Sequence, residues 1–142
     1  MVVKIKLLPG GTVPTRGSLE AAGYDIYVVE DTTLHPSERK SIPTRLCVKI
    51  PSGNWLDIRG RSSAFERRGI GVVLGTVDAD YVGEVRIQLH NLTDHEIQIR
   101  KGERLAQFVP NGKNAGEPVE WIVVDELEKT ERNQGGFGST GI

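Results

Sequence analysis

This sequence of 142 residues has one cysteine, no long apolar run and almost no net charge. A lone cysteine, Cys47, excludes an intrachain disulfide and a multi-cysteine metal site, and it indicates a reducing compartment. We expect Cys47 to be a small buried hydrophobe. No apolar run approaches the length of a signal sequence or membrane span, which predicts no membrane association and a cytoplasmic protein, with a nuclear or viral context also open. The net charge of -1 argues against the basic face that nucleic-acid binding requires.

The chain length and a change in composition predict one folded domain followed by a tail. A chain of this size can bury a core without cross-links, and we place the domain at residues 1–124. From Asp125 a charged stretch leads into a Gly-rich end. Glycines bury no side chain and lose the most entropy on ordering. Residues 125–142 are therefore either a disordered end, or a linker and an arm that orders over a ligand.

Apolar and polar residues alternate with a period of two along much of the chain, which predicts half-buried strands. The inward residues of these strands are Val3, Ile5, Leu7, Leu46, Val48, Ile50, Leu56, Ile58, Val85, Ile87, Leu89, Ile97 and Ile99. Turn signals rich in Pro, Gly and Asn separate them, so we expect an all-β jelly roll or barrel. One brief helix is predicted after Ser62 or Ser63, either of which could cap it.

Five short segments carry the side chains best suited to chemistry. Their sequences are AGYDI at residues 22–26, GRSS at 60–63, GTVDADYVGE at 75–84, GERLAQ at 102–107 and RNQGGFGSTG at 132–141. Each segment alone is weak. Together, and in this order, they resemble the five motifs of the trimeric dUTPase family, and the resemblance spans most of the chain.

This resemblance implies a fold, an activity and an assembly. The fold would be a jelly-roll-like β-barrel of the dUTPase type with a flexible Gly-rich C-terminal arm. The activity would be hydrolysis of dUTP to dUMP and pyrophosphate by attack of water at the α-phosphorus, which keeps uracil out of DNA and supplies dUMP for thymidylate synthesis. The protein would be a homotrimer whose active sites take their phosphate seat, uracil hairpin and closing arm from different subunits.

The third segment would hold the reacting water and the nucleoside. By resemblance, Asp78 is the general base, and the ring of Tyr81 packs against the deoxyribose and leaves no room for a 2′-hydroxyl. Gly75 and Val77 are expected to contact the substrate in the same segment. Without the other motifs, Asp78 would be read as a turn residue and Tyr81 as a core residue.

The phosphates would meet the second, fourth and fifth segments. Arg61 offers a forked cation, and Ser62 and Ser63 offer hydroxyls and amides at a helix start, which suits a phosphate. By resemblance Gln107 is a further phosphate contact, although alone it would be a polar residue pointing out of a strand. The arm would close over the nucleotide through an arginine, a stacking aromatic ring and small polar residues, namely Arg132, Phe137, Gly138, Ser139 and Thr140.

A magnesium ion is expected to arrive with the triphosphate, because Mg²⁺ keeps much of its water shell and bridges phosphate oxygens. The resemblance gives Asp25 an indirect contact with this ion, through water. Otherwise Asp25 would be an ordinary surface or turn carboxylate. The sequence predicts no dedicated protein metal cage.

The chain departs from the family at two places. Residues 72–74 read Val-Val-Leu where many members have Asn-Ser-Pro before the glycine, and Asn133 replaces a glycine of the last motif.

Two alternative functions stay open. One is a dCTP deaminase, against which Gln88 and Glu66 stand at positions where those enzymes carry a catalytic glutamate and an arginine. The other is a non-catalytic nucleotide-binding protein, for which the carboxylate of Asp78 would serve no purpose.

Overall fold

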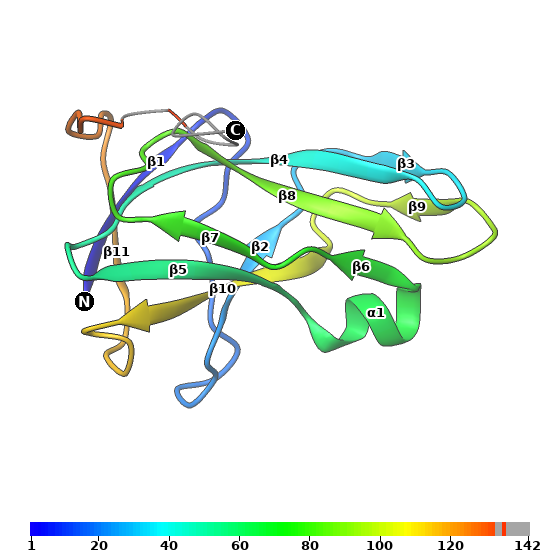
Figure 1. Ribbon diagram of the computed structural model, residues 1–142, viewed down its shortest axis with the longest axis horizontal. Coiled ribbons are helices and arrows are strands. Elements are labelled where there is room, and N and C mark those ends of the chain that lie inside the picture. The colour runs from blue at the N-terminus through cyan, green and yellow to red at the C-terminus, as the bar shows by residue number, and fades with distance from the viewer. Residues whose placement is uncertain (133–134, 136–142) are drawn as a thin grey trace.

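The computed structural model describes residues 1–132 and residue 135, and over these residues the chain is built almost entirely of strands (Figure 1). One short helix, α1 (Ser62–Arg68), interrupts them. The strands are β1 (Val2–Leu7), β2 (Tyr24–Tyr27), β3 (Thr32–Leu34), β4 (Arg39–Lys49), β5 (Asn54–Gly60), β6 (Ile70–Val72), β7 (Gly75–Asp78), β8 (Glu84–Asn91), β9 (Ile97–Ile99), β10 (Arg104–Gly112) and β11 (Glu120–Val123).

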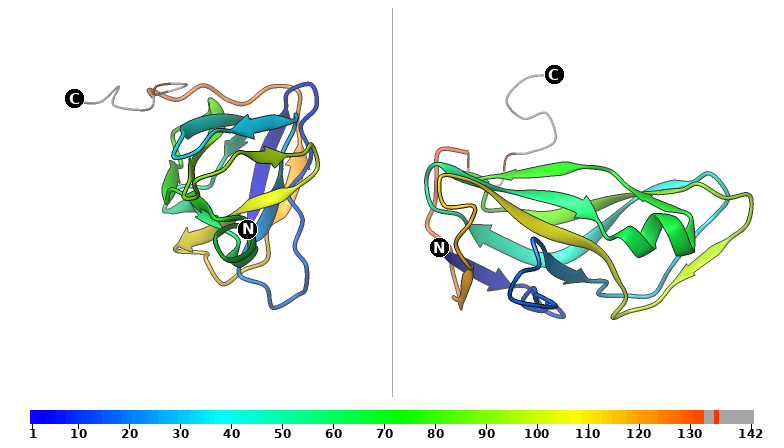
Figure 2. Two further views of the ribbon diagram at one scale, coloured as in Figure 1. Left: turned by 90° about the vertical axis from the view of Figure 1, so that its right-hand side faces the viewer. Right: turned by 90° about the horizontal axis from the view of Figure 1, so that it is seen from below.

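The strands form three sheets. The first has the order β11-β1-β4-β8-β6, the second has the order β2-β10-β5-β7, and β3 and β9 form a small third sheet. All pairs are antiparallel except β1 with β11, which run parallel. Viewed along the long axis, the strands surround a common interior (Figure 2). The prediction of an all-β, jelly-roll-like fold is confirmed, with the ladders divided among separate sheets.

The core forms where the alternating apolar residues of the sheets meet. Phe108 on β10 is fully buried, as are Ile5 on β1 and Leu89 on β8. Burial of each such side chain contributes about 1.5–3 kcal/mol to the hydrophobic stabilisation. The predicted inward positions are buried apart from Leu7, which is half-buried at the edge of the core, and Cys47 is buried as expected.

Helix α1 was predicted, but its cap was not. The helix begins at Ser62, so Arg61 occupies the N-cap position with extended backbone, and no side chain caps it. The prediction of a serine cap is wrong because both serines already lie inside the first turn. The helix ends at Arg68 and is capped by Gly69 in the left-handed conformation, whose N–H reaches the carbonyls of Ala64 and Phe65. With seven residues, this helix is far too short to cross a membrane, and the rest of the described chain offers no better candidate.

The chain after β11 runs back along β1 without regular secondary structure. Lys4 lies 3.0 Å from the carboxylate of Glu128, and Lys6 lies 3.2 Å from that of Glu126. These exposed pairs contribute little stability. Further along, the Thr130 hydroxyl donates to the carbonyl of Asp80, which lies in the turn between β7 and β8. The division into a domain at 1–124 and a tail at 125–142 remains a prediction.

Candidate active site

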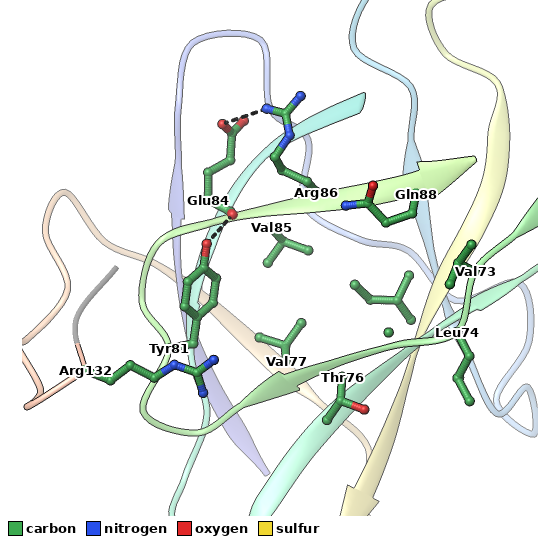
Figure 3. A pocket seen from close by; sticks show the side chains of 12 residues that line it. Val73, Leu74, Thr76, Val77, Tyr81, Glu84, Val85, Arg86, Gln88 and Arg132 are labelled. Atoms are coloured by element: carbon green, nitrogen blue, oxygen red, sulfur yellow. Dashed lines mark hydrogen bonds and ion pairs between the residues drawn. The ribbon is translucent and has the colours of Figure 1, made fainter. Parts of the chain in front are cut away.

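A pocket of about 170 Å³ lies between β7 and β8 (Figure 3). It is comparable in size to the engineered apolar cavities of roughly 150 Å³ that admit one aromatic ring. Gly75 and Val77 line it from β7, and Val85 lines it from β8. Val73 and Leu74 lie in the loop that precedes β7 and are largely exposed. The pocket therefore suits one small planar ring.

The two strands that flank the pocket belong to different sheets. On its described residues, β7 pairs with β5 alone, whereas β8 pairs with β4 and, over Leu89–Asn91, with β6. One hydrogen bond joins the loop before β7 to β8: the Val73 N–H donates to the Gln88 carbonyl over 2.9 Å. Strand edges left without ladder partners present N–H and C=O groups to a ligand. A base seated here can be recognised by main-chain hydrogen bonds.

Tyr81 closes one end of the pocket. Its hydroxyl donates to the Glu84 carbonyl over 2.7 Å, and burial raises the pKa of Tyr81, so the ring remains neutral near physiological pH. The residue at position 83 must be glycine for the ring to lie this way, because a Cβ on Gly83 would sit 2.8 Å from the Tyr81 hydroxyl oxygen. The turn thus fixes an aromatic face beside the ring-sized pocket.

Asp78 lies at the end of β7, next to this aromatic face. Its side chain is half exposed, and its Oδ2 lies 2.5 Å from Nη1 of Arg132. The guanidinium of Arg132 also lies over the Tyr81 ring, 5.6 Å from the centroid, and its Nε donates to the Gly135 carbonyl over 2.7 Å. The hydrogen bond to Asp78 raises the pKa of Arg132, which therefore keeps its charge. Carboxylate, aromatic ring and arginine form one cluster, called here the hairpin cluster.

A second cluster surrounds Asp25 on β2 and is called here the helix-end cluster. Arg61 Nε lies 3.2 Å from Asp25 Oδ1, and Arg104 Nη1 lies 3.1 Å from Asp25 Oδ2. Arg61 also donates to the Arg104 carbonyl over 3.1 Å. Two arginines around one largely buried carboxylate leave the cluster with a net positive charge, which favours an anion.

Gln107 completes the helix-end cluster. Its side-chain amide donates to the Gly60 carbonyl over 3.3 Å. A Cβ on Gly23 would lie only 1.9 Å from Gln107 Oε1, so glycine is required for this side chain to fit. Ser62 is exposed and Ser63 is half-buried at the start of α1, directly after Arg61. The first, second and fourth sequence segments thus meet at one place.

The end of β7 and the start of α1, which carry parts of the two clusters, lie at opposite ends of β5 (Figure 1). Asp78 is paired with Trp55 at the start of β5, whereas Gly60, which precedes Arg61, ends it. At roughly 3.3–3.4 Å per residue, the strand separates them by about 17 Å. Asp78 and Arg61 of one chain are therefore too far apart to contact the same phosphate group.

The structure brings the predicted residues together in two groups, and it adds others. Gly75, Val77, Asp78, Tyr81 and Arg132 belong to the hairpin cluster or its pocket. Asp25, Arg61 and Gln107 belong to the helix-end cluster, with Ser62 and Ser63 beside it. The predictions for Phe137, Gly138, Ser139 and Thr140 lie outside the described residues. Sequence reasoning gave no site role to Arg104 or Arg86, took Ile58 only as an inward strand residue and used Gln88 only to argue against a deaminase. Their place at the site depends on strand pairing.

The described residues include no group of three or more His, Cys, Asp or Glu side chains arranged to hold a metal ion. Asp25 does fit an indirect contact. Its Oδ2 accepts a hydrogen bond from Arg104, its Oδ1 forms an ion pair with Arg61, and an ionised carboxylate has about four acceptor sites. Its remaining sites can accept from water molecules around a cation.

Comparison with known proteins agrees with this geometry. The dUTPase family model matches residues 10–141. The chain is 40% identical to a deoxyuridine 5'-triphosphate nucleotidohydrolase of Saccharomyces cerevisiae, covering 99% of this chain and 95% of the yeast protein. It is 41% identical to the enzyme of that name from Paramecium bursaria Chlorella virus 1, with 96% and 95% covered.

Solved structures give the same answer. A dUTPase of Staphylococcus bacteriophage 80alpha, solved with dUpNHpp, superposes with a TM-score of 0.74 at 28% identity, covering 99% of this chain and 98% of the phage chain. A phage phi11 dUTPase with a TM-score of 0.72 and 26% identity, over 91% and 96% of the chains, is described as coordinating a structural Mg(II) ion.

The comparisons and the fold thus define a nucleotide-hydrolysing enzyme of the all-β class. More narrowly, the chain belongs to the dUTPase family. Its activity is the hydrolysis of dUTP to dUMP and pyrophosphate.

Proposed function

We propose that this chain hydrolyses dUTP in a homotrimer, with Asp78 as general base and with each active site assembled from more than one copy. The observation that carries the proposal is the separation of the hairpin cluster from the helix-end cluster along β5. Each cluster has half of what the reaction needs. A homotrimer with shared sites brings the halves together.

At the hairpin cluster, Asp78 takes a proton from a water molecule as that water attacks the α-phosphorus. The bond from the α-phosphorus to the bridging oxygen breaks, and pyrophosphate leaves. Arg132 occupies Oδ2 of Asp78, which leaves Oδ1 for the water. The side chain is half exposed, so water reaches it readily. Removal of a general base typically lowers the rate roughly 10²- to 10⁴-fold.

The pocket between β7 and β8 receives the uracil ring. The unpaired edges of the two strands offer main-chain donors and acceptors to the base. Tyr81 packs against the deoxyribose and excludes a 2′-hydroxyl. Recognition by the backbone does not need the amide side chain that residues 72–74 lack.

The helix-end cluster of a neighbouring copy receives the phosphates. Arg61 and Gln107, with the amides and hydroxyls of Ser62 and Ser63, are placed to bind phosphate oxygens. Asp25 holds Arg61 and Arg104 in place and, through water, contacts a Mg²⁺ ion that arrives with the substrate. When bound, that ion neutralises phosphate charge. Arg132, and by resemblance Phe137, Gly138, Ser139 and Thr140, close the site.

The alternative of a dCTP deaminase loses its support. The family model and the relatives compared above are dUTPases, and Gln88 cannot shuttle the proton that deamination requires. The proposal of a pure nucleotide-binding protein leaves the exposed carboxylate beside the pocket without a role.

Mixing two inactive variants tests the shared site. Asp78→Asn removes the base, and Arg61→Ala removes the phosphate seat, and each alone should be nearly inactive. After the two are unfolded, mixed equally and refolded, random assembly should restore about a quarter of wild-type sites if the two residues come from different copies. A mixture as inactive as its parents would refute the shared site. Refolded wild-type protein is the control for recovery, and light scattering reports whether trimers form.

A further inference from the structure

Some polar side chains around the pocket between β7 and β8 already form hydrogen bonds within the protein, and others do not. Tyr81 donates to the Glu84 carbonyl, and the Glu84 carboxylate accepts from the Arg45 N–H over 2.9 Å. Arg86 donates through Nε to the hydroxyl of Ser41 over 2.8 Å and through Nη2 to its carbonyl over 3.1 Å. These groups are held by the protein and are not free to read a ligand.

Two polar side chains lining the pocket, those of Thr76 and Gln88, have no hydrogen-bond partner within the described part of the chain. Thr76 is exposed on the side of β7 that faces away from β8 (Figure 3). Gln88 is half-buried on β8. Its amide is thus the uncommitted side-chain donor and acceptor at the pocket.

The main chain of Gln88 is fixed, so its side chain has a defined starting point. Its carbonyl accepts from the Val73 N–H, and Gln88 pairs with Ser41 across the β4–β8 ladder. The loop that contributes Val73 and Leu74 to the pocket adds only apolar side chains. A polar group of a bound base in this region therefore has Gln88 as its side-chain partner.

The position of Gln88 selects which edge of the base it meets. Tyr81 marks the sugar end of the pocket through its bond to the Glu84 carbonyl, and Gln88 lies four residues further along β8, about 13 Å away. A pyrimidine carries its sugar on N1, and C4 lies across the ring from N1. When the deoxyribose rests on Tyr81, the 4-oxo group points toward Gln88.

We propose that the side-chain amide of Gln88 donates a hydrogen bond to the 4-oxo group of uracil and is a specificity-determining residue of this enzyme. The inference rests on the proposed dUTP site. Because Gln88 contacts the base and not the phosphorus, its loss changes KM and leaves kcat nearly as it was. An amide donor suits the 4-oxo group, whereas a carboxylate at the same place only accepts, and so favours the 4-amino group of cytosine.

The test compares wild type, Gln88→Leu and Gln88→Glu on dUTP, on dCTP and on the 5′-triphosphate of the 2-pyrimidinone deoxynucleoside, which lacks the 4-oxo group. Gln88→Leu should raise KM for dUTP about two- to tenfold, the loss of one neutral hydrogen bond. It should handle the 2-pyrimidinone analogue as wild type does, because the group that Gln88 reads is already absent. Gln88→Glu should raise KM for dUTP at least tenfold and reduce the preference for dUTP over dCTP.

The matched control is Gln98→Leu, the same change at an exposed position of β9 outside the pocket, which should leave KM unchanged. Equal KM values for dUTP in wild type and Gln88→Leu would overturn the inference, as would equal losses on dUTP and on the analogue. Gln88→Glu keeps the size of the side chain and decides the matter if Gln88→Leu does not fold: an unchanged dUTP preference would overturn the inference. Failure of the proposed function is distinguishable, because the mixture of Asp78→Asn and Arg61→Ala would then stay inactive, whereas the KM comparison requires only that wild type hydrolyses dUTP.

Discussion

The two clusters at the ends of β5 each contain an aspartate, Asp25 or Asp78, and the two side chains differ in how far they are buried. In the helix-end cluster, the Asp25 side chain is 11% exposed, and its two oxygens form ion pairs with Arg61 and Arg104. In the hairpin cluster, the Asp78 side chain is 51% exposed, and its partner Arg132 lies in a segment without regular secondary structure. One carboxylate is built into the fold, and the other is presented at its edge.

This difference shows how one residue type serves two purposes. A largely buried carboxylate with two cations fixes the positions of those cations, and its removal leaves like charges together. An exposed carboxylate contributes little to stability and stays open to water and substrate. Substitution of Asp78 should therefore lower activity with little change in stability, whereas substitution of Asp25 should lower both.

The largest effect is expected at Asp78. Asp78→Asn should lower kcat roughly 10²- to 10⁴-fold, because the amide cannot accept a proton from water. The melting temperature should stay close to that of wild type, since the ion pair with Arg132 is at the surface. Steady-state kinetics and calorimetry measure the two. The control is Asp80→Asn, whose Oδ1 lies 3.4 Å from the same arginine. If Asp80→Asn lost as much activity as Asp78→Asn, the general base would not be assigned to Asp78.

A smaller effect on rate, with a clear effect on stability, is expected at Asp25. Asp25→Ala leaves Arg61 and Arg104 without their shared counter-charge, and should lower the free energy of unfolding by about 1–3 kcal/mol. The estimate stays below that for a fully buried pair because both arginines are about a third exposed or more. Denaturant titration measures the loss. Asp25→Asn, which keeps the acceptor oxygen, should recover part of it, and equal stability of Asp25→Ala and wild type would contradict this account.

Much of the fold could be predicted because alternation is a local signal. The strands β1, β8 and β9 follow from it directly. Strand β10 escaped prediction by alternation because it lies between β2 and β5, and Leu105 and Ala106 are buried side by side. The parallel pairing of β1 with β11 joins the two ends of the domain, and no local pattern encodes it.

The site divides in the same way. Motif resemblance found Asp25, Arg61 and Gln107, but their meeting with Arg104 depends on the register of β2 and β5 against β10. The role proposed for Gln88 depends on a further fact that the sequence does not contain. The other polar side chains on the pocket side already form hydrogen bonds within the protein. Residue types could be read from the sequence, whereas hydrogen-bond partners required the structure.

The smallest predicted effect separates the ring of Tyr81 from its hydroxyl. Tyr81→Phe loses the hydrogen bond to the Glu84 carbonyl, which should lower the free energy of unfolding by about 0.5–1.5 kcal/mol. The ring and its contact with Arg132 remain, so rejection of UTP should stay as strong as in wild type. Denaturant titration and the ratio of kcat/KM for dUTP and UTP measure the two quantities. If the variant hydrolysed UTP readily, the hydroxyl and not the ring would exclude the 2′-hydroxyl, and the aromatic face beside the pocket would have lost its assigned role.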